Sequence, residues 1–320
     1  MAAFARAEDP VAQSQIPATS AEAPLAESKI QNPKSKIGPP YLWKITPHGG
    51  GATSWIFGTI HLQRPDVARL VPAVQTALDH ADAVYTELPM DTATMLGIAP
   101  RLVLPKGQTL DALLGPKLAT DLQSELKLVN PLLTLGPLNH LKPWAIAATL
   151  LELGDQLKYP MSQPLDILIY QRGVDAHKEV GGIETVDEQL AIFDDLGTAD
   201  QIALVRETIA QLREVRAKGE SSSDILTRLY LAGDLDKLVA ELMKWDAAGT
   251  DPQLEARLMD RLLYRRDAIM AERMLRKLRE HPSTSYFFAV GAAHLQGDRG
   301  LLASLRKAGY RLDRVQSATP

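Results

Sequence analysis

One short pattern occurs twice in this chain: a strand-like apolar run that ends in Gly-x-x-His. The first copy is Gly58-Thr59-Ile60-His61 and the second, more than 200 residues later, is Gly291-Ala292-Ala293-His294. Glycine lets backbone pass close to another group, and an imidazole is a metal ligand or a proton carrier. If the two runs form adjacent strands, both imidazoles lie over one edge of a sheet. The pattern therefore predicts an α/β fold with an active site at that edge.

Composition excludes several classes of protein. The 320 residues include 35 basic and 39 acidic ones, a net charge of -4 that gives no electrostatic footprint for nucleic acid. There are no cysteines, which excludes disulfides, thiolate metal sites and a thiol nucleophile. No apolar run approaches the roughly 18 residues needed to cross a bilayer, so we expect no integral membrane segment.

The first 38 residues are rich in Pro, Ala, Ser and Gln and lack periodicity, which predicts a disordered tail before a domain over 39–320. Within this tail, Phe4-Ala5-Arg6-Ala7 has the small-x-small form of a signal-peptidase site. One interpretation is the remnant of an export signal, with a periplasmic or cell-envelope location. The other is a chance Ala-rich start on a cytoplasmic protein.

The segments that follow predict a sheet interrupted by helices. Strands at 41–45 and 54–58, joined by a glycine turn, indicate a β-hairpin. Helical spacing over 66–81 precedes a strand at 83–88, and this order indicates a parallel βαβ unit.

The middle of the chain has mainly helical spacing, broken at prolines and glycines. The predicted elements are helices within 90–165, at 165–173, within 187–248, at 252–281 and at 300–308, with strands at 179–184, 285–290 and 311–315. The expected fold class is therefore α/β (α+β): a central mixed sheet with Gly-x-x-His strand ends and a large helical insertion.

Three carboxylates accompany the paired histidines. Glu87 ends an apolar strand, where an ionised group needs a partner or a metal, although it also fits a helix cap or a surface position. Glu184 ends the strand at 179–184 and stands before a possible capping box from Thr185 to Glu188, which does not account for it. Asp166 is either an N-terminal helix acid or a buried partner. Two histidines and a carboxylate suit a divalent transition metal.

Two adjacent arginines fall within the helical pattern at 252–281. Arg266 lies inside the apolar arc, whereas Arg265 lies nearer its edge. A buried guanidinium normally pairs with a carboxylate, and the alternative is that either side chain extends to solvent. The arc consists of Leu258, Leu262, Leu263, Ile269 and Met270.

These elements together, over residues 40–316, resemble the TraB/GumN family, which includes the animal Tiki proteins. Five motifs in the family's order carry the resemblance. They are Leu42–Ile45 with Gly58–His61, Tyr85–Leu88, Leu165–Asp166 with Gly182–Thr185 and Gln189, Arg266–Met270, and Val290–Leu295. One departure is Asp267, which stands where the family usually has Asn.

The resemblance implies a fold related to erythromycin esterases and to the haem-binding ChaN proteins, with a divalent-metal site. Tiki members are described as metal-dependent proteases, so the implied function is a metal-dependent hydrolase, a Tiki-like peptidase acting on a peptide or protein. His61 and His294 are then expected to bind Mn, Co or Zn, with Glu87 as third ligand or as base. Arg266 is expected to steady Glu87 or Glu184, or to stabilise an oxyanion.

Two other interpretations remain from the sequence. The ChaN relationship allows a haem- or iron-binding protein that uses the same two-histidine cleft. A non-catalytic envelope or regulatory protein is the third. The sequence has neither a Gly-x-Ser-x-Gly elbow nor a His-Glu-x-x-His helix, which argues against ordinary serine hydrolases and zinc-helix proteases.

Overall fold

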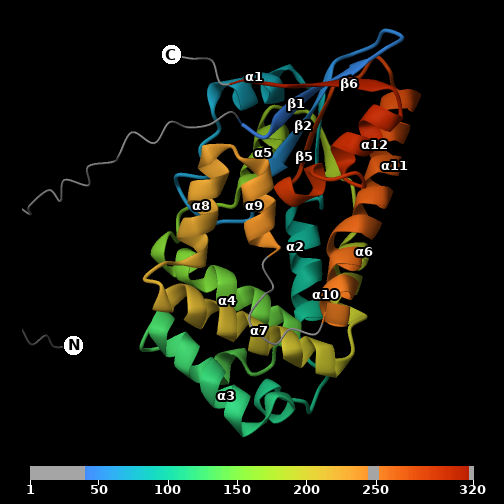
Figure 1. The fold of residues 1–320 in the computed structure, drawn as a ribbon. Coiled ribbons are helices and arrows are strands. Elements are labelled where there is room, and N and C mark those ends of the chain that lie inside the picture. The colour runs from blue at the N-terminus through green and yellow to red at the C-terminus, as the bar shows by residue number, and fades with distance from the viewer. Residues whose placement is uncertain (1–39, 244–251, 317–320) are drawn as a thin grey trace, which may run out of the picture. The chain divides into compact units, whose positions relative to one another are not determined.

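A six-stranded mixed sheet is the centre of the part of the chain that the structure, a computed structural model, describes: residues 40–243 and 252–316. Its strand order is β4-β3-β5-β2-β1-β6 (Figure 1). The predicted tail over 1–38 and the end of the helical pattern within 187–248 fall outside the described residues. The strands are β1 Leu42–Pro47, β2 Ser54–Thr59, β3 Ala83–Thr86, β4 Glu179–Gly182, β5 Tyr286–Gly291 and β6 Tyr310–Arg314.

The predicted hairpin is confirmed. β1 and β2 pair antiparallel with Trp43 opposite Ile56, and β6 pairs antiparallel with the other side of β1. The turn passes through Gly50 at φ 87° and Gly51 at φ 129°, a backbone region that side chains with a Cβ rarely adopt. The glycine run therefore makes this tight connection possible.

β5 lies between β2 and β3, parallel to both, and β4 is parallel to β3. The two strands of the predicted βαβ unit, β2 and β3, are therefore parallel as expected, and β5 lies between them. β5 takes the central place because both of its faces are apolar. Phe288 packs on one side of the sheet and Phe287 on the other, and neither is accessible to solvent.

The helix predicted at 66–81 is shorter, since α1 runs only from Pro72 to His80. Residues before it form turns, in which the N–H groups of Val67 and Ala68 both donate to the Arg64 carbonyl. Pro72 at the first helical position holds Val71 extended, at φ -69° and ψ 153°, so the helix cannot begin earlier.

Helices cover both faces of the sheet. α1 and α5 (Leu165–Asp175) pack on one face against Phe287, and α11 (Arg265–Glu280) and α12 (Leu301–Lys307) pack on the other against Phe288. α5 opens at Leu165 as predicted.

The helical insertion forms a second apolar core of its own, built from α3, α4 and α7 (Figure 1). α3 bends at Gly115-Pro116, where Gly115 has φ 71°. The elements are α2 Thr92–Ile98, η1 Ala99–Leu102, α3 Leu110–Val129, η2 Gly136–Leu138, α4 Pro143–Lys158, α6 Val186–Asp194, α7 Thr198–Ala217, α8 Ser222–Ala232 and α9 Leu235–Leu242.

The helix predicted at 252–281 contains a π-helical segment. α10 (Pro252–Met259) leads into η3 (Asp260–Tyr264) and then into α11. Arg266 is buried in the first turn of α11, as the apolar arc predicts, while the Arg265 side chain is 68% exposed and pairs with Asp260 at 2.6 Å.

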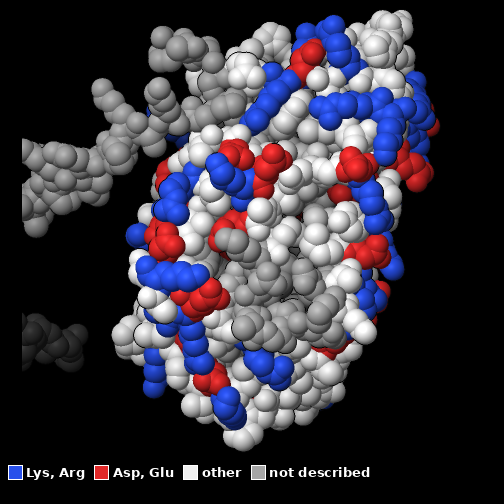
Figure 2. All heavy atoms as spheres, in the orientation of Figure 1, with Lys and Arg blue, Asp and Glu red and all other residues white. Residues whose placement is uncertain are grey.

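None of the described helices has the length and apolar character needed to span a membrane. On the face drawn in Figure 2, acidic and basic side chains lie next to one another over much of the surface. This intermixing agrees with the small net charge of -4.

Candidate active site at the strand ends

Each of the four parallel strands contributes one polar side chain at its carboxyl end. In the spatial order β4, β3, β5, β2, these residues are Glu184, Glu87, His294 and His61. His294 belongs to a short 3-10 turn, η4 (Ala292–Leu295), that follows β5 directly. The two Gly-x-x-His copies therefore do lie on adjacent parallel strands, with Thr59 opposite Gly291.

Three of these side chains meet at Gly291. A Cβ built on Gly291 would lie 3.1 Å from Glu87 Oε1, 3.5 Å from His294 Cδ2 and 3.9 Å from His61 Nε2. The backbone of Gly291 has an ordinary negative φ of -53°, so no conformational demand explains the residue. Glycine is needed here because any side chain would occupy the space that the three groups share.

The glycine of the first copy has a different role. A Cβ on Gly58 would lie 2.7 Å from Leu295 Cδ1 and 3.2 Å from the Ala292 Cα. Gly58 therefore allows η4, which carries His294, to pack directly against β2. Gly58 thus lets η4 pack closely against β2, and Gly291 leaves room for the two imidazoles and Glu87.

Glu87 is buried and its carboxylate accepts four hydrogen bonds or charge contacts. Oε2 accepts from Arg266 Nη2 at 2.5 Å and from Gln189 Nε2 at 3.0 Å, and Oε1 accepts from the Gly291 N–H at 2.6 Å. His294 Nε2 lies 3.6 Å from Oε1. Burial opposes ionisation, but the Arg266 guanidinium, the two imidazoles and the Gly291 N–H outweigh it and hold the pKa of Glu87 well below its usual range.

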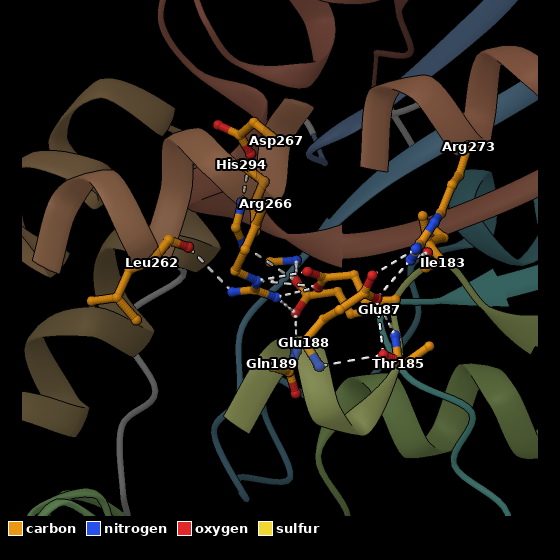
Figure 3. Close-up of polar contacts among 12 residues, drawn as sticks. Glu87, Ile183, Thr185, Glu188, Gln189, Leu262, Arg266, Asp267, Arg273 and His294 are labelled. Atoms are coloured by element: carbon orange, nitrogen blue, oxygen red, sulfur yellow. Dashed lines mark hydrogen bonds and ion pairs between the residues drawn. The ribbon is translucent and has the colours of Figure 1, made fainter. Parts of the chain in front are cut away.

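Arg266 contacts Glu87 (Figure 3) and also binds Glu184, so it joins the two carboxylates. Its Nη2 also donates to Glu184 Oε2 at 2.6 Å, its Nε donates to both Glu184 oxygens, and its Nη1 donates to the Leu262 carbonyl in the π-helical segment at 3.2 Å. Burial opposes the charge on Arg266, yet the two carboxylates raise its pKa above the ordinary value. The predicted carboxylate pairing of a buried guanidinium is thus present.

The predicted capping box after Glu184 is also present. The Thr185 side chain accepts from the Glu188 N–H, and Glu188 accepts from the Thr185 N–H. Glu188 in turn pairs with Arg273 at 2.7 Å (Figure 3). Thr185 and Glu188 therefore cap the start of α6, whereas Glu184 binds Arg266.

His294 is buried and held through its other ring nitrogen. Its Nδ1 lies 2.6 Å from Oδ1 of Asp267, the residue that follows Arg266 on α11 (Figure 3). Burial raises the pKa of Asp267, against the pull of His294. With Nδ1 directed to Asp267, Nε2 is the nitrogen that faces Glu87.

His61 has the same arrangement but is half exposed. Its Nδ1 lies 2.8 Å from Oδ2 of Asp166, and its side chain is 53% exposed. Asp166 is the buried partner that one sequence interpretation expected, and its other oxygen accepts from Thr59 Oγ1 at 2.5 Å. The Asp166 charge raises the pKa of His61 to about 10, against the opposing effect of desolvation.

The sequence reasoning missed the role of Asp267. The one signal it carried is its place beside Arg266 on a mostly apolar helix face, where a second charged residue needs a partner of its own. Gln189 was noted only as part of a family motif, and its bond to Glu87 depends on α6 folding back over β3.

The donor set has features that suit a divalent cation. Two imidazoles, each with Nδ1 beside a carboxylate, keep Nε2 for a ligand, and Glu87 Oε1 lies with them around the Cα of Gly291. Ligands about 2.1 Å from one tetrahedral ion are roughly 3.4 Å apart, close to the 3.6 Å between His294 Nε2 and Glu87 Oε1. Nevertheless, across residues 40–243 and 252–316, no group of three or more His, Asp or Glu side chains has the arrangement of a metal site.

The comparisons with known proteins agree with this class of α/β protein. The TraB/PrgY/gumN family profile matches residues 41–314, and the chain belongs to that family. No solved structure matches the chain.

The curated relatives share about a quarter of their aligned residues with this chain. The "Metalloprotease TIKI1" of Danio rerio is 24% identical over 330 residues, which cover 91% of this chain and 66% of the relative. The "Metalloprotease TIKI1" of Homo sapiens is 24% identical, covering 88% of this chain and 63% of the relative. The "Uncharacterized protein YbaP" of Shigella flexneri is 25% identical over 80% of this chain and 89% of its own length. The chain thus spans slightly less than two thirds of the length of the Tiki relatives.

Proposed function

We propose that this protein is a metal-dependent hydrolase that cleaves peptide bonds at the carboxyl ends of β2, β3 and β5. The observation that carries the proposal is the meeting of Glu87, His61 and His294 around the bare Cα of Gly291. The relatives named metalloproteases supply the reaction class. Mn, Co and Zn remain the expected ions.

His61 and His294 would hold the ion through Nε2, with Glu87 Oε1 as the acidic ligand. A bound divalent ion lowers the pKa of water toward neutrality and polarises a carbonyl group. Asp166 and Asp267 orient the two rings, since each carboxylate favours the tautomer that carries its proton on Nδ1.

Glu87 suits a ligand better than a general base. An efficient base has a pKa near the working pH, whereas the environment of Glu87 holds its pKa well below the usual carboxyl range. Oε2 is also already bonded to Arg266 and Gln189. Glu87 is therefore a fixed negative charge in the site, and it remains ionised throughout the physiological pH range.

Arg266 acts as a positioning residue. Its Nε, Nη1 and Nη2 atoms all donate to protein acceptors, so its guanidinium is directed to Glu87, Glu184 and Leu262. This arrangement supports the steadying role expected from the sequence over the oxyanion role. Glu184 is the second carboxylate that accepts hydrogen bonds from Arg266.

Metal analysis of the purified protein, followed by peptidase assays with added Mn, Co or Zn, tests the proposal. We expect bound or bindable divalent ion and hydrolysis that a chelator abolishes. His294→Asn should remove both, whereas His48→Asn, which changes an exposed histidine in the hairpin turn, should remove neither. An absorption spectrum of bound haem, without metal-stimulated hydrolysis, would instead favour the haem-binding alternative.

A further inference from the structure

A cavity of about 380 Å³, with both polar and apolar side chains in its wall, lies next to the loop that carries His61. Residues of α3, α4 and α7 and of the start of α8 line it, and Arg64, three residues after His61, lies in its wall. Neither the proposed hydrolytic chemistry nor the family motifs use its residues.

Carboxylates outnumber cations around Arg64 in this cavity. Its guanidinium, which is almost fully buried, lies 2.7 Å from Asp224, 3.4 Å from Asp66 and 3.6 Å from Asp155. Two cations, Arg64 and the wall residue Lys158, which acts electrostatically on Asp155, thus face three carboxylates. Another cation at this end of the cavity would improve the local balance.

Asp155 is the carboxylate with unused capacity. The residue is 7% exposed, and its Oδ1 accepts from Ser223 Oγ at 3.3 Å. Its buried Oδ2 has no hydrogen-bond partner among the residues that the structure describes, and neither does the nearby Ser222 Oγ. Burial also raises the pKa of Asp155. A buried acceptor without a donor is costly, so a donor supplied by a ligand would be bound favourably.

The other charges of the cavity wall are occupied. Arg216 pairs with Glu125, and Glu220 pairs with Arg228 at 3.3 Å. Lys158 stands over the ring of Tyr159, 5.1 Å from its centroid. Asp155 is thus a wall carboxylate with a buried oxygen that has no hydrogen-bond partner among the described residues.

Aliphatic side chains line another part of the wall. Leu128 and Leu151 are 62% and 42% exposed, unusually open for leucine, and Val129 lies beside them. An apolar wall with a carboxylate beside it matches the methylene stem and the charged head of a long basic side chain.

We propose that this cavity is a substrate subsite that binds a lysine or arginine side chain of a peptide, with Asp155 as the residue that determines the preference. The inference rests on the proposed peptidase function for the identity of the ligand. The excess of carboxylates around Arg64, the buried and unpartnered Asp155 oxygen and the apolar wall all match that one chemistry.

The cavity is close enough to the candidate active site for one peptide to reach both. Arg64 in the cavity wall follows His61 by three residues, so their Cα atoms are at most about 11 Å apart. Each residue of an extended peptide spans about 3.3 Å. A peptide bound at His61 therefore needs only a few residues to place a side chain in the cavity.

The test is calorimetric binding of two acetylated, amidated tetrapeptides to the full chain without added metal. One has a lysine between leucines, and the other has norleucine in its place. We expect the lysine peptide to bind at least about tenfold more tightly, and Asp155→Asn to abolish that difference, because a buried charged hydrogen bond is lost. Asp79→Asn, which removes an exposed carboxylate on α1, is the matched control and should keep the preference.

Equal binding of the two peptides by the parent protein, including no measurable binding of either, would overturn the subsite. So would an equal loss of both peptides in a folded Asp155→Asn variant. Asp155-dependent binding without hydrolysis under any metal would support the subsite while refuting the peptidase. Metal-dependent hydrolysis without any lysine preference would do the reverse.

Discussion

Nδ1 of His294 lies 2.6 Å from Oδ1 of Asp267, and both side chains are buried. His61 and Asp166 repeat this pairing at 2.8 Å on the neighbouring strand end. Two carboxylate–imidazole pairs thus flank Glu87, and in each pair the free nitrogen is Nε2. The ring of His294 thus has a charged partner.

Replacing Asp267 tests whether that pairing tunes the site. Asp267→Ala should weaken divalent-metal affinity by about 10- to 100-fold, the usual effect of removing a carboxylate that orients a histidine ligand. Asp267→Asn should lose less, because its amide oxygen still accepts the Nδ1 proton. Metal titration followed calorimetrically gives the comparison. Equal affinity in Asp267→Ala and the parent would show that Asp267 does not act through His294.

Gly291→Ala places a methyl group at the point that Glu87, His294 and His61 share. We expect the fold to persist, since the backbone of Gly291 is compatible with alanine, and metal binding and hydrolysis to be lost. Gly97→Ala, on an exposed part of α2 with open space around it, should leave both unchanged. Thermal unfolding monitors the fold. Full activity in a folded Gly291→Ala protein would place the chemistry elsewhere.

The sequence could indicate which candidate residues lie together at the strand ends, because each one follows a short apolar run and this is a local signal. Burial of Arg266 was equally readable from helical periodicity. The position of β5 between β2 and β3 was not, since pairing of strands far apart in sequence leaves no local pattern. The same holds for the two aspartate–histidine pairs, in which partners come from different elements. The helix predicted at 66–81 began too early because the prediction used apolar spacing alone. It did not include the extended backbone that Pro72 requires at Val71.

Arg266→Met leaves two buried carboxylates without their cation. We expect a loss of about 3–5 kcal/mol in the free energy of unfolding near pH 7. Arg265→Met, a change of the exposed neighbouring arginine, should fall within about 0.5 kcal/mol of the parent. Urea unfolding of the three proteins measures this. A small effect at Arg266 would mean that Glu87 and Glu184 find other compensation.

The free energy of unfolding of Arg266→Met should change with pH in the opposite direction to that of the parent protein. In the parent, the lowered pKa of Glu87 contributes stability above its unfolded value of 4.5, and this is lost as the pH falls toward the folded-state pKa. Without Arg266, burial instead raises the carboxyl pKa values, so lowering the pH to about 5 should recover part of the lost stability. Parallel decline of the two proteins would contradict the charge argument.

Glu87→Gln separates the two roles that the sequence left open. The amide keeps the shape and Arg266 retains Glu184, so the fold should persist while hydrolysis falls at least about 100-fold. If Glu87 is a ligand, as proposed, the metal content of the variant should fall too. If Glu87 is instead a general base, the variant should lose activity and keep its metal content. A variant equal to the parent in metal content, stability and rate would shift the acidic role to Glu184.

The last prediction concerns the titration of His61 in the metal-free protein. The Asp166 carboxylate raises its pKa from 6.5 to about 10, so the imidazole should stay protonated well above neutrality. This pair contributes stability that is fully present below pH 6.5 and is lost as the pH rises through about 10. Because a metal must displace that proton, divalent affinity should rise with pH over the same interval. Asp166→Asn should return the pKa toward 6.5, and metal affinity should then level off at lower pH. Proton NMR of the imidazole, with Asp79→Asn as the control, measures the shift. An unshifted His61 in the parent would remove the argument that Asp166 governs this ring.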